Sequence, residues 1–515
     1  MITVEKPKFQ QRVQEVTVNS QQLCLGELRL NASFYGKEVS KANRLLEENG
    51  YEIVSLGENF SKDVYYLGRQ KRFFANANVG KPYMMPSELF DFPFTPSKFV
   101  YAKKLKRLDE WAVKEGWVLL TRSGKLGEVT LSTKTLENFM VSDDVIRIVP
   151  KDETHFGFLY AYLTTWIGKA LLTKNQYGVA IDHIEPHHVK TVRVPFLPEE
   201  IQRIIHINIL KVFNLREIAR EQLSKSQSAL LKELGLPTYE EPTETKPFSL
   251  TSSGLDLRFD ASFHVPTVDR IKQKLQDCLY KPENLKGNVE RIFYPNRFKR
   301  IYVEKEYGVP FLSGTQISQV KPYDLKFISR KVTENLEDCL IYPGWVLVTR
   351  SGTVGKAALA PTDWNKWAAS EHVIRIIPKE KKIHSGFLTA FLQSEYGHQQ
   401  IISKIYGGVV DEIAENDLYA ILIPLPPWEI QERIGKLVVE AYELRELANK
   451  IENETVKLLE NMLQEGQMAS QESYFSTFEI IGDECLDVMQ GLAQEKQGQL
   501  GSWAELKKET GLDEI

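Results

Sequence analysis

The chain has 515 residues, of which 42% are hydrophobic and 26% charged, as in soluble globular proteins large enough for two or more domains. Its net charge of −4 excludes a uniformly basic coat for nucleic acid but not local basic patches. The four cysteines form no CxxC pair, which argues against a zinc site or a disulfide framework and fits a reducing compartment. The N-terminus is charged, and no apolar run approaches the roughly 18–20 residues of a membrane helix. We therefore expect a cytoplasmic protein.

One stretch of the sequence occurs twice. GWVLLTRSGKLG begins at Gly116, and GWVLVTRSGTVG begins at Gly344, 228 residues later (344 − 116 = 228). Each copy opens with an apolar run, Trp117–Leu120 or Trp345–Val348, that is long enough for one buried strand. A polar turn with two glycines follows. A period this long indicates a duplicated domain rather than a solenoid.

Further matches extend the duplication along the chain at offsets of 228 or 229. The charged stretches Lys41–Glu48 and Val268–Gln276 are predicted to be helices. The other matching segments are NASF at 31–34 and DASF at 260–263, the aromatic and basic segments 66–74 and 294–302, VIRI at 145–148 and 373–376, and the helix-opening Gly-Phe pairs at 157–158 and 386–387.

Each copy ends at a proline-rich boundary and continues into a predicted helix of about 35 residues, roughly 50 Å long. The second helix carries apolar or small residues at a 4,3 spacing from Ile430 to Met462, which is typical of a coiled-coil seam. The first helix holds its seam less well, with Asn208 and Gln222 in it. Two seam-bearing helices most simply pack antiparallel, which would place the two globular domains a rod's length apart.

The fold class is therefore α/β (α+β), with two duplicated domains separated by two long antiparallel coiled-coil helices in a pseudo-two-fold arrangement. The expected divisions are a first domain at 1–196, a helix at 197–236, a linker at 237–246, a second domain at 247–425, a helix at 426–465, and a tail at 466–515. The tail has no counterpart in the first copy. It includes an apolar patch (Phe475, Phe478, Ile480, Ile481) and a predicted short helix from Ser502.

These features, in this order and repeated twice, resemble the DNA-specificity (S) subunits of Type I restriction–modification systems. The resemblance covers roughly residues 28–464 and rests on the NASF and DASF segments, both TRSG-x-x-G turns, both Tyr-Gly segments (177–178 and 406–407) and both proline-rich entries into long helices. It implies two target-recognition domains, each reading one half of a bipartite site in double-stranded DNA. The tail departs from the family pattern, so the host complex can be either a Type I system or a related methylation-linked phage-defence system.

The resemblance also implies partners. Two methyltransferase (modification) subunits, which carry S-adenosylmethionine, would dock on the helices, and a restriction or translocase subunit would join a full assembly. No cofactor is expected in this chain. The first helix has more apolar residues than one seam needs, which gives modest independent support for a partner surface on the helices. The predicted partner-binding residues are Ile204, Ile207, Phe213, Leu437, Leu444 and Ile451.

Cations beside aromatic residues are the first candidates for DNA contact, because they combine phosphate binding with base-edge or stacking contact. The alternative is a solvated edge strand with outward charges. The candidates, which match between the copies at offset 228, are Arg69, Lys71 and Arg72 in the first copy and Arg297, Lys299 and Arg300 in the second.

The TRSG turns are the second candidates, because backbone N–H groups in a glycine turn, an arginine and a hydroxyl suit a phosphate oxygen. A purely structural turn with glycines at positive φ is the alternative, and both interpretations can hold together. Residues that differ between the copies are candidates for reading the DNA sequence. The alternative is that these surface residues have simply diverged. The predicted residues are Thr121, Arg122, Ser123, Lys125 and Lys174, and Thr349, Arg350, Ser351 and Lys404.

Motifs for catalysis fail on inspection. GTVGK at 352–356 lacks the first glycine of a phosphate-binding loop, because Arg350 stands there. Pro426-Pro427-Trp428 lacks the Asn or Asp of an amino-methyltransferase motif, because Leu425 precedes it. His183, His187 and His188 have no counterparts in the second copy, so we expect no metal site.

We therefore predict a non-catalytic subunit that reads DNA and directs adenine methyltransferase subunits to it. The competing hypothesis is a protein-interaction scaffold with duplicated binding domains on a coiled-coil spacer. A third, a fused DNA-modifying enzyme, is disfavoured by the failed motifs.

Overall fold

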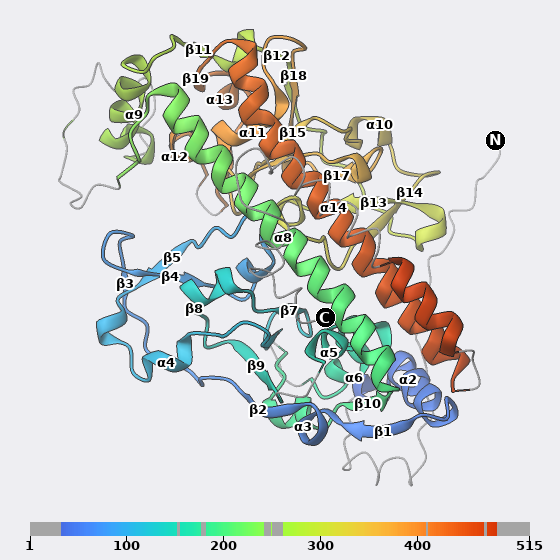
Figure 1. Cartoon of the computed structure of the whole chain (residues 1–515). Helices are drawn as coiled ribbons and strands as arrows, with labels where there is room; N and C mark the ends of the chain where they lie inside the picture. The colour runs from blue at the N-terminus through green and yellow to red at the C-terminus, as the bar shows by residue number, and fades with distance from the viewer. Residues whose placement is uncertain are drawn as a thin grey trace, which may run out of the picture.

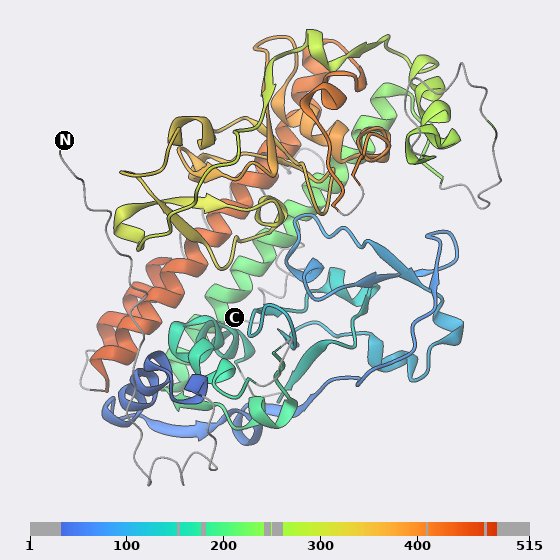
Figure 2. The same cartoon turned by 180° about the vertical axis from the view of Figure 1, so that it is seen from behind.

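The computed structural model describes residues 32–151, 155–176, 182–240, 249, 261–407, 410–467 and 471–481. In this part of the chain, two α/β domains flank two long helices that lie side by side in both views (Figure 1 and Figure 2). The order along the chain is domain, helix, domain, helix, which confirms the predicted architecture. None of the helices in the described ranges combines the length and apolar character that a membrane crossing needs.

The first domain is built on a four-stranded sheet in the order β2-β9-β6-β7, with a second sheet β3-β5-β4-β8 and the pair β1-β10. All neighbours pair antiparallel except β4 and β8. Its elements are α2 (Lys37–Glu48), β1 (Glu52–Ser55), α3 (Leu56–Asn59), β2 (Ser61–Tyr65), β3 (Phe74–Ala75), β4 (Lys81–Met84), β5 (Lys98–Val100), α4 (Leu108–Trp111), β6 (Val118–Thr121), β7 (Val129–Leu131), β8 (Met140–Val141), β9 (Val145–Pro150), α5 (Phe156–Thr164), α6 (Trp166–Thr173), α7 (Pro186–Lys190) and β10 (Arg193–Phe196).

The second domain repeats this plan, with sheets in the orders β12-β18-β15-β16 and β14-β13-β17 and the pair β11-β19. Its elements are α9 (Pro266–Gln276), β11 (Pro282–Asn284), β12 (Val289–Phe293), β13 (Gly308–Leu312), β14 (Lys326–Ser329), α10 (Leu336–Cys339), β15 (Val346–Thr349), β16 (Ala357–Leu359), β17 (Ala368–Ala369), β18 (Val373–Pro378), α11 (Ser385–Gln393), α12 (Glu395–Ile402), α13 (Glu415–Tyr419) and β19 (Leu422–Pro424).

The duplicated apolar runs form the central strands β6 and β15. All four residues of each strand are buried, which explains why the runs are continuous rather than alternating. The pairing register is also shared, since Val118 pairs with Ile148 in the first domain and Val346 with Ile376 in the second. The sequence therefore predicted these strands correctly to within one residue.

Each domain is held to its own long helix by a glycine at the start of a buried helix. A Cβ on Gly157 of α5 would lie 2.8 Å from the carbonyl oxygen of His206, and one on Gly386 of α11 would lie 2.2 Å from that of Gly435. Only glycine permits this close approach of two helix backbones. The repeated Gly-Phe pair in the sequence thus marks the joint between domain and helix.

The two long helices are α8 (Glu199–Leu234) and α14 (Trp428–Glu465). They run antiparallel, because Arg216 pairs with Glu452 while the later Glu233 pairs with the earlier Arg433. The predicted seam is largely buried. Its buried members are Ile201, Ile205, Val212, Leu215 and Ala219 on α8, and Ile434, Ala441, Leu444, Ala448, Ile451, Thr455 and Met462 on α14.

The predicted partner-binding residues do not form an exposed surface. Five of the six, all except Leu437, are buried within this chain, so the prediction was wrong for those five. On α8 the apolar excess faces the chain's own domain. The Phe213 ring, for example, packs edge-on against Tyr160 of α5 with ring centroids 5.2 Å apart. An apolar face wider than one seam therefore marked a second intramolecular contact.

Part of the tail packs against α8. Residues 471–481 form a helix in which Phe478 and Ile481 are buried. The Asn208 Nδ2 atom donates a hydrogen bond to the Phe478 carbonyl at 2.7 Å, so the polar residue in the α8 seam has a backbone partner. Of the predicted apolar patch, Ile480 is exposed. The helix predicted from Ser502 lies outside the described residues.

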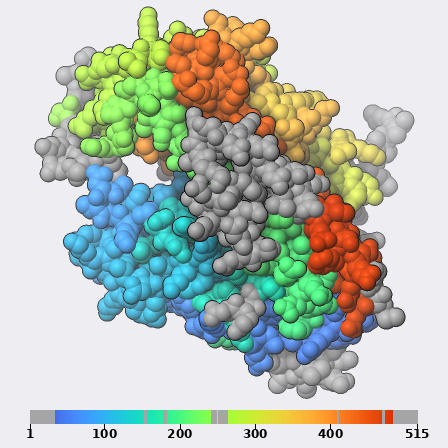
Figure 3. Space-filling view, in the orientation of Figure 1, coloured from blue at the N-terminus to red at the C-terminus, as the bar shows by residue number. Residues whose placement is uncertain are grey.

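The domains are not separated by the helices alone. In the space-filling view the first domain (blue to cyan) lies below the second (yellow-green to orange) (Figure 3). They touch directly where Asp91 of the first domain bridges Gln319 of the second. The expectation that the domains stand a rod's length apart was therefore wrong, because loops from both domains reach each other beside α14.

A buried polar cluster lies at the middle of the helix pair. The Glu452 carboxylate of α14 accepts hydrogen bonds from Arg216 of α8 and Tyr160 of α5, and Lys321 of the second domain lies 3.1 Å from it. Burial raises the pKa of Glu452, but the charges of Arg216 and Lys321 and the Tyr160 hydrogen bond outweigh burial and lower the pKa to about 2. The cluster joins both helices and both domains.

Replacing Glu452 with Ala is expected to lower the free energy of unfolding by about 3–5 kcal/mol, because Arg216 would be left buried without its carboxylate. Urea unfolding of the full chain measures this. Glu443→Ala, at an exposed site on the same helix, is the matched control and should cost less than about 0.5 kcal/mol. Equal losses in the two variants would show that the cluster is not a stabilising contact.

The depressed pKa of Glu452 also predicts a pH dependence. Since the folded-state pKa lies below the unfolded one, the Glu452 contribution is present above about pH 4.5 and is lost as pH falls toward 2. The stability difference between the native chain and Glu452→Gln should shrink by about 3 kcal/mol over that range. A difference that stays constant with pH would contradict the assignment.

Candidate nucleic-acid interface

The TRSG turns have the same geometry in both domains. The Thr121 hydroxyl donates to the Lys125 carbonyl, and the Thr349 hydroxyl donates to the Thr353 carbonyl, so each threonine closes its own turn. Both threonines are buried. Gly124, Gly127, Gly352 and Gly355 all have positive φ, between 74° and 91°, as the structural interpretation of the turn requires.

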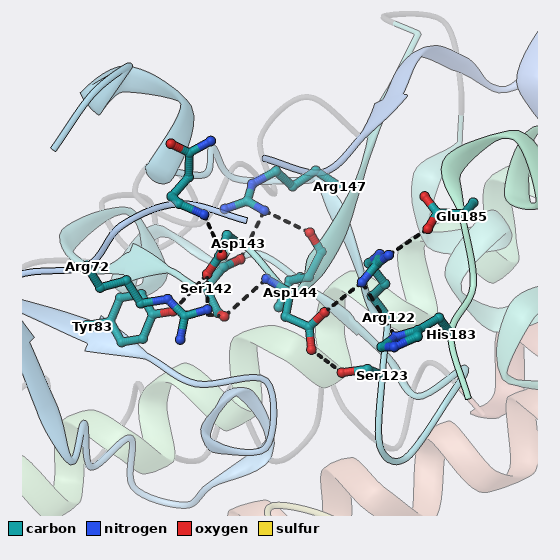
Figure 4. Close-up of polar contacts among 12 residues, drawn as sticks. Arg72, Tyr83, Arg122, Ser123, Ser142, Asp143, Asp144, Arg147, His183 and Glu185 are labelled. Atoms are coloured by element: carbon teal, nitrogen blue, oxygen red, sulfur yellow. Dashed lines mark hydrogen bonds and ion pairs between the residues drawn. The ribbon is translucent and has the colours of Figure 1, made fainter. Parts of the chain in front are cut away.

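The arginine of each turn lies over a tyrosine ring and is held by carboxylates. The Arg122 guanidinium is 4.3 Å from the Tyr66 ring centroid. It donates to Glu185 at 2.5 Å and to Asp144 at 3.2 Å (Figure 4). Arg350 is 4.4 Å from the Tyr294 centroid and donates to Glu412 at 2.8 Å. Tyr66 and Tyr294 are counterparts at offset 228, so the repeated tyrosine was a signal of this contact.

The carboxylate partners come from different positions in the two domains, because Glu412 is the counterpart of His183 and Ala414 is that of Glu185. The serine partners differ as well. The Ser123 hydroxyl donates to Asp144, whereas Ser351 Oγ lies 2.5 Å from Nδ1 of His372, the counterpart of Asp144. The turn backbone is thus shared, while its charge environment is specific to each domain.

The three cations of each loop have different environments. Arg72 is paired with Asp143 at 2.8 Å, and one terminal nitrogen of Arg300 donates to both carboxylate oxygens of Glu371 at 2.7 Å. Arg69, Lys71, Arg297 and Lys299 are instead exposed, in both domains alike. The sequence match did not distinguish the third cation from the first two, because the acid that pairs with it lies 71 residues further along the chain.

An exposed aromatic residue lies close to each of these loops. Phe74 is 51% exposed, and the Lys98 ammonium lies over its ring at 5.1 Å. Tyr302 is 43% exposed, and Lys326 lies over its ring at 5.0 Å. Sequence reasoning missed Lys98 and Lys326, although both are followed by phenylalanine at the same offset of 228.

In the first domain the loop and the turn come together around one cavity of about 440 Å³. Arg69, Arg72, Arg122 and Ser123 all line it, together with Asp143, Asp144 and His183. Predicted residues from segments about 50 positions apart in the chain therefore line the same cavity. Arg72 and Arg122 are paired with acids that line the cavity, whereas Arg69 is exposed.

The remaining predicted lysines have other contacts. Lys174 lies over the Phe34 ring at 5.7 Å, and Lys404 lies over the Phe263 ring at 4.6 Å. These rings end the NASF and DASF segments, so the two lysines occupy equivalent places despite their offset of 230 in the sequence. Lys125 pairs with Asp324 of the other domain, a contact that sequence reasoning did not foresee.

Sequence reasoning also missed two buried arginines with a structural role. Arg147 and Arg375 of the VIRI strands are fully buried and donate to backbone carbonyls, those of residues 141, 142 and 145 in the first domain and of 339, 369, 370 and 373 in the second. Burial lowers the pKa of each guanidinium to about 10, so both remain charged at neutral pH. Their repetition in VIRI was the available signal.

The family model for the Type I restriction modification DNA specificity domain matches residues 48–226 and 294–456. The chain belongs to this family. The two matched segments contain both TRSG turns, both loops that carry the exposed cations, and most of α8 and α14. The membership confirms the resemblance inferred from the repeated motifs.

Two solved structures are also similar to the chain. The S subunit of a Type I system from M. genitalium has a TM-score of 0.32 and 14% identity, covering 81% of this chain and 96% of that one. The HsdS subunit from Thermoanaerobacter tengcongensis has a TM-score of 0.27 and 16% identity, covering 84% and 97%. Because these scores are low, the family assignment rests on the family model. A comparison with curated proteins found no match.

The different environments of neighbouring cations predict different mutational effects. Arg300→Ala should lower the free energy of unfolding by about 1 kcal/mol, since Glu371 loses its charged hydrogen-bond partner at a partly exposed site. Arg297→Ala, three residues away and exposed, should leave stability within about 0.5 kcal/mol of the native value. Urea midpoints of the two variants test this difference, and a reversed order would refute the assigned roles.

Proposed function

We propose that this chain reads a bipartite sequence in double-stranded DNA, one half with each domain, and directs adenine methyltransferase subunits to that site. The main observation behind this proposal is that some predicted cations are exposed while others are paired with acids. Most of the predicted arginines are neutralised by nearby carboxylates, yet Arg69, Lys71, Arg297 and Lys299 are left exposed in equivalent places of both domains. Two exposed cations at matched positions of each domain are suited to bind phosphates of two DNA half-sites.

The exposed aromatic pairs extend each candidate surface. Phe74 with Lys98, and Tyr302 with Lys326, each offer an apolar face and a cation close to the loop. Phe74 and Lys98 lie on β3 and β5, whereas Tyr302 bridges Ile328 of β14, the strand that carries Lys326. Such a combination suits contact with sugar edges and phosphates. Figure 1 places β3–β5 and β13–β14 on opposite sides of the molecule, which fits two separate contacts with one duplex.

The predicted DNA-contact set is narrowed accordingly. Thr121 and Thr349 close their turns, while Arg72, Arg122, Arg300 and Arg350 are paired within the chain; we propose that these six position the surface rather than bind phosphate. Shared residues would contact the backbone of DNA, and residues that differ between the domains would read bases. Lys174 and Lys404 remain candidates beside the Phe34 and Phe263 rings.

Catalysis would belong to partners. Two methyltransferase subunits would carry S-adenosylmethionine, and a restriction or translocase subunit would join in a full assembly, as the family implies. The predicted apolar residues on α8 and α14 are largely buried, so the partner surface on these helices would be formed by their outward polar residues and by Leu437.

The proposal is tested by selecting random duplex DNA with the full chain co-expressed with the methyltransferase encoded beside it. The expected result is a motif of two short specific blocks around a fixed gap. A result without any enriched sequence, together with binding that hardly depends on salt, would rule out the proposed function and favour a protein scaffold.

Substitutions in one domain should affect one block only. Arg297→Ala/Lys299→Ala should weaken binding about tenfold or more at roughly 0.15 M salt and reduce the salt slope by about 1–2, because two phosphate contacts are lost. Arg69→Ala/Lys71→Ala is the matched variant for the other block. Binding to duplexes with one block scrambled identifies which block each domain reads. Equal effects on both blocks would contradict a division of labour.

A further inference from the structure

The two domains meet through equivalent loops, 86–97 and 314–325, here called the junction loops. Asp91 and Gln319 form an antiparallel bridge, in which Phe92 N donates to the Ser318 carbonyl at 2.7 Å and Val320 N donates to the Phe90 carbonyl at 2.7 Å. Gln319 is the counterpart of Asp91 at offset 228. A residue can pair with its own counterpart only on the pseudo-two-fold axis, so the bridge lies on that axis.

Side chains reinforce the bridge on both sides. Lys356, which follows the second TRSG turn, is paired with the buried Asp91 at 2.6 Å. The Phe90 and Tyr323 rings pack edge to face with centroids 5.2 Å apart, and Lys125 of the first TRSG turn pairs with Asp324. Each of these contacts joins one domain to the other.

The junction loops also rest on α14. The Phe92 ring packs edge-on against Tyr442 with centroids 5.5 Å apart, and it lies 5.3 Å from the guanidinium of the buried Arg445. From the other loop, the Val320 carbonyl accepts from Asn449 Nδ2 at 2.8 Å. The junction is therefore bound to the helix pair as well as to itself.

Two attachments fix a domain more firmly than one. The joint at Gly157 or Gly386 ties each domain to its long helix, and the junction ties the domains to each other at a second point. A change of one base pair in the gap would move one half-site by about 3.4 Å and by about a tenth of a turn relative to the other. A domain attached only by its helix joint is freer to follow such a displacement.

We propose that the junction, and not the length of α8 and α14 alone, sets the gap between half-sites that the chain accepts. This inference rests on the proposed function. It assigns Lys125 and Lys356, both beside TRSG turns, to gap selection through domain contact. Their acidic partners Asp91 and Asp324 become positioning residues, which can be removed without removing a phosphate contact.

A disulfide across the axis tests the proposal within one protein. Antiparallel bridged residues have Cα atoms about 4.5–5.5 Å apart, which is within the range for a disulfide, so Asp91→Cys/Gln319→Cys should oxidise readily. The full chain, co-expressed with its methyltransferase, is assayed on duplexes that carry the selected half-sites at the native gap and at gaps one or two base pairs shorter or longer. The native chain under both redox conditions controls for the natural cysteines.

Oxidised protein should keep the native preference for one gap, and reduction should lower the ratio of native-gap to altered-gap binding by about two- to tenfold, as expected for loss of a few modest contacts. The isosteric variant Asp91→Asn/Asp324→Asn should relax the gap similarly without any cysteine. Asp109→Asn/Asp338→Asn, with the same change in charge at exposed sites away from the junction, should keep the native ratio.

The failures of the two proposals are distinguishable. If the native chain prefers one gap but that preference is unchanged on reduction and in Asp91→Asn/Asp324→Asn, the helices alone set the gap and only the present inference fails. Failure of the disulfide to form would also overturn it, because the bridge would not exist in solution. If the native chain shows no preferred gap at all, the proposed function fails and the inference fails with it.

Discussion

The buried carboxylate of Glu452 is the interaction on which the arrangement of the whole chain depends. An ionised carboxylate in the protein interior is tolerated only when charged and hydrogen-bonding partners surround it. Those partners come from α8, α5 and the second domain, so satisfying one side chain brings four separate elements to one place. Sliding α8 along α14 would separate Arg216 from Glu452 and leave two buried charges, which makes the native register strongly preferred.

This cluster occurs on only one side of the pseudo-two-fold axis. The counterpart of Glu452 is Leu223, that of Tyr160 is Thr389, and that of Lys321 is Pro93. The counterpart of Arg216 is Arg445, which is buried among the rings of Phe92, Trp364 and Tyr442 instead of being paired with an acid. Equivalent arginines are thus stabilised by an acid in one half and by aromatic rings in the other, so the two halves of the molecule are not interchangeable.

Elsewhere the duplication is kept where backbone geometry requires it and lost where only charge is involved. The threonine hydroxyls and the buried Arg147 and Arg375 are the same in both domains because each donates to backbone carbonyls of a turn or strand end. The turn glycines are the same because the turn needs positive φ there. The acids around Arg122 and Arg350 come from unequal positions. Many geometries can neutralise one arginine, whereas few can close the same turn.

The sequence by itself determined the duplicated strands, the long helices and their antiparallel seam, because these depend on periodic patterns and on turn residues that act over short distances. It also indicated equivalent places in both copies for six cations, Arg69, Lys71, Arg72, Arg297, Lys299 and Arg300. Only the tertiary structure decided which cations are neutralised, since Arg300 meets Glu371 and Lys125 meets Asp324 across long stretches of chain. It also decided that Ile204 and Phe213 are core and that the domains touch at Asp91 and Gln319. Such contacts depend on how separate elements pack, and no local pattern of residues encodes that packing.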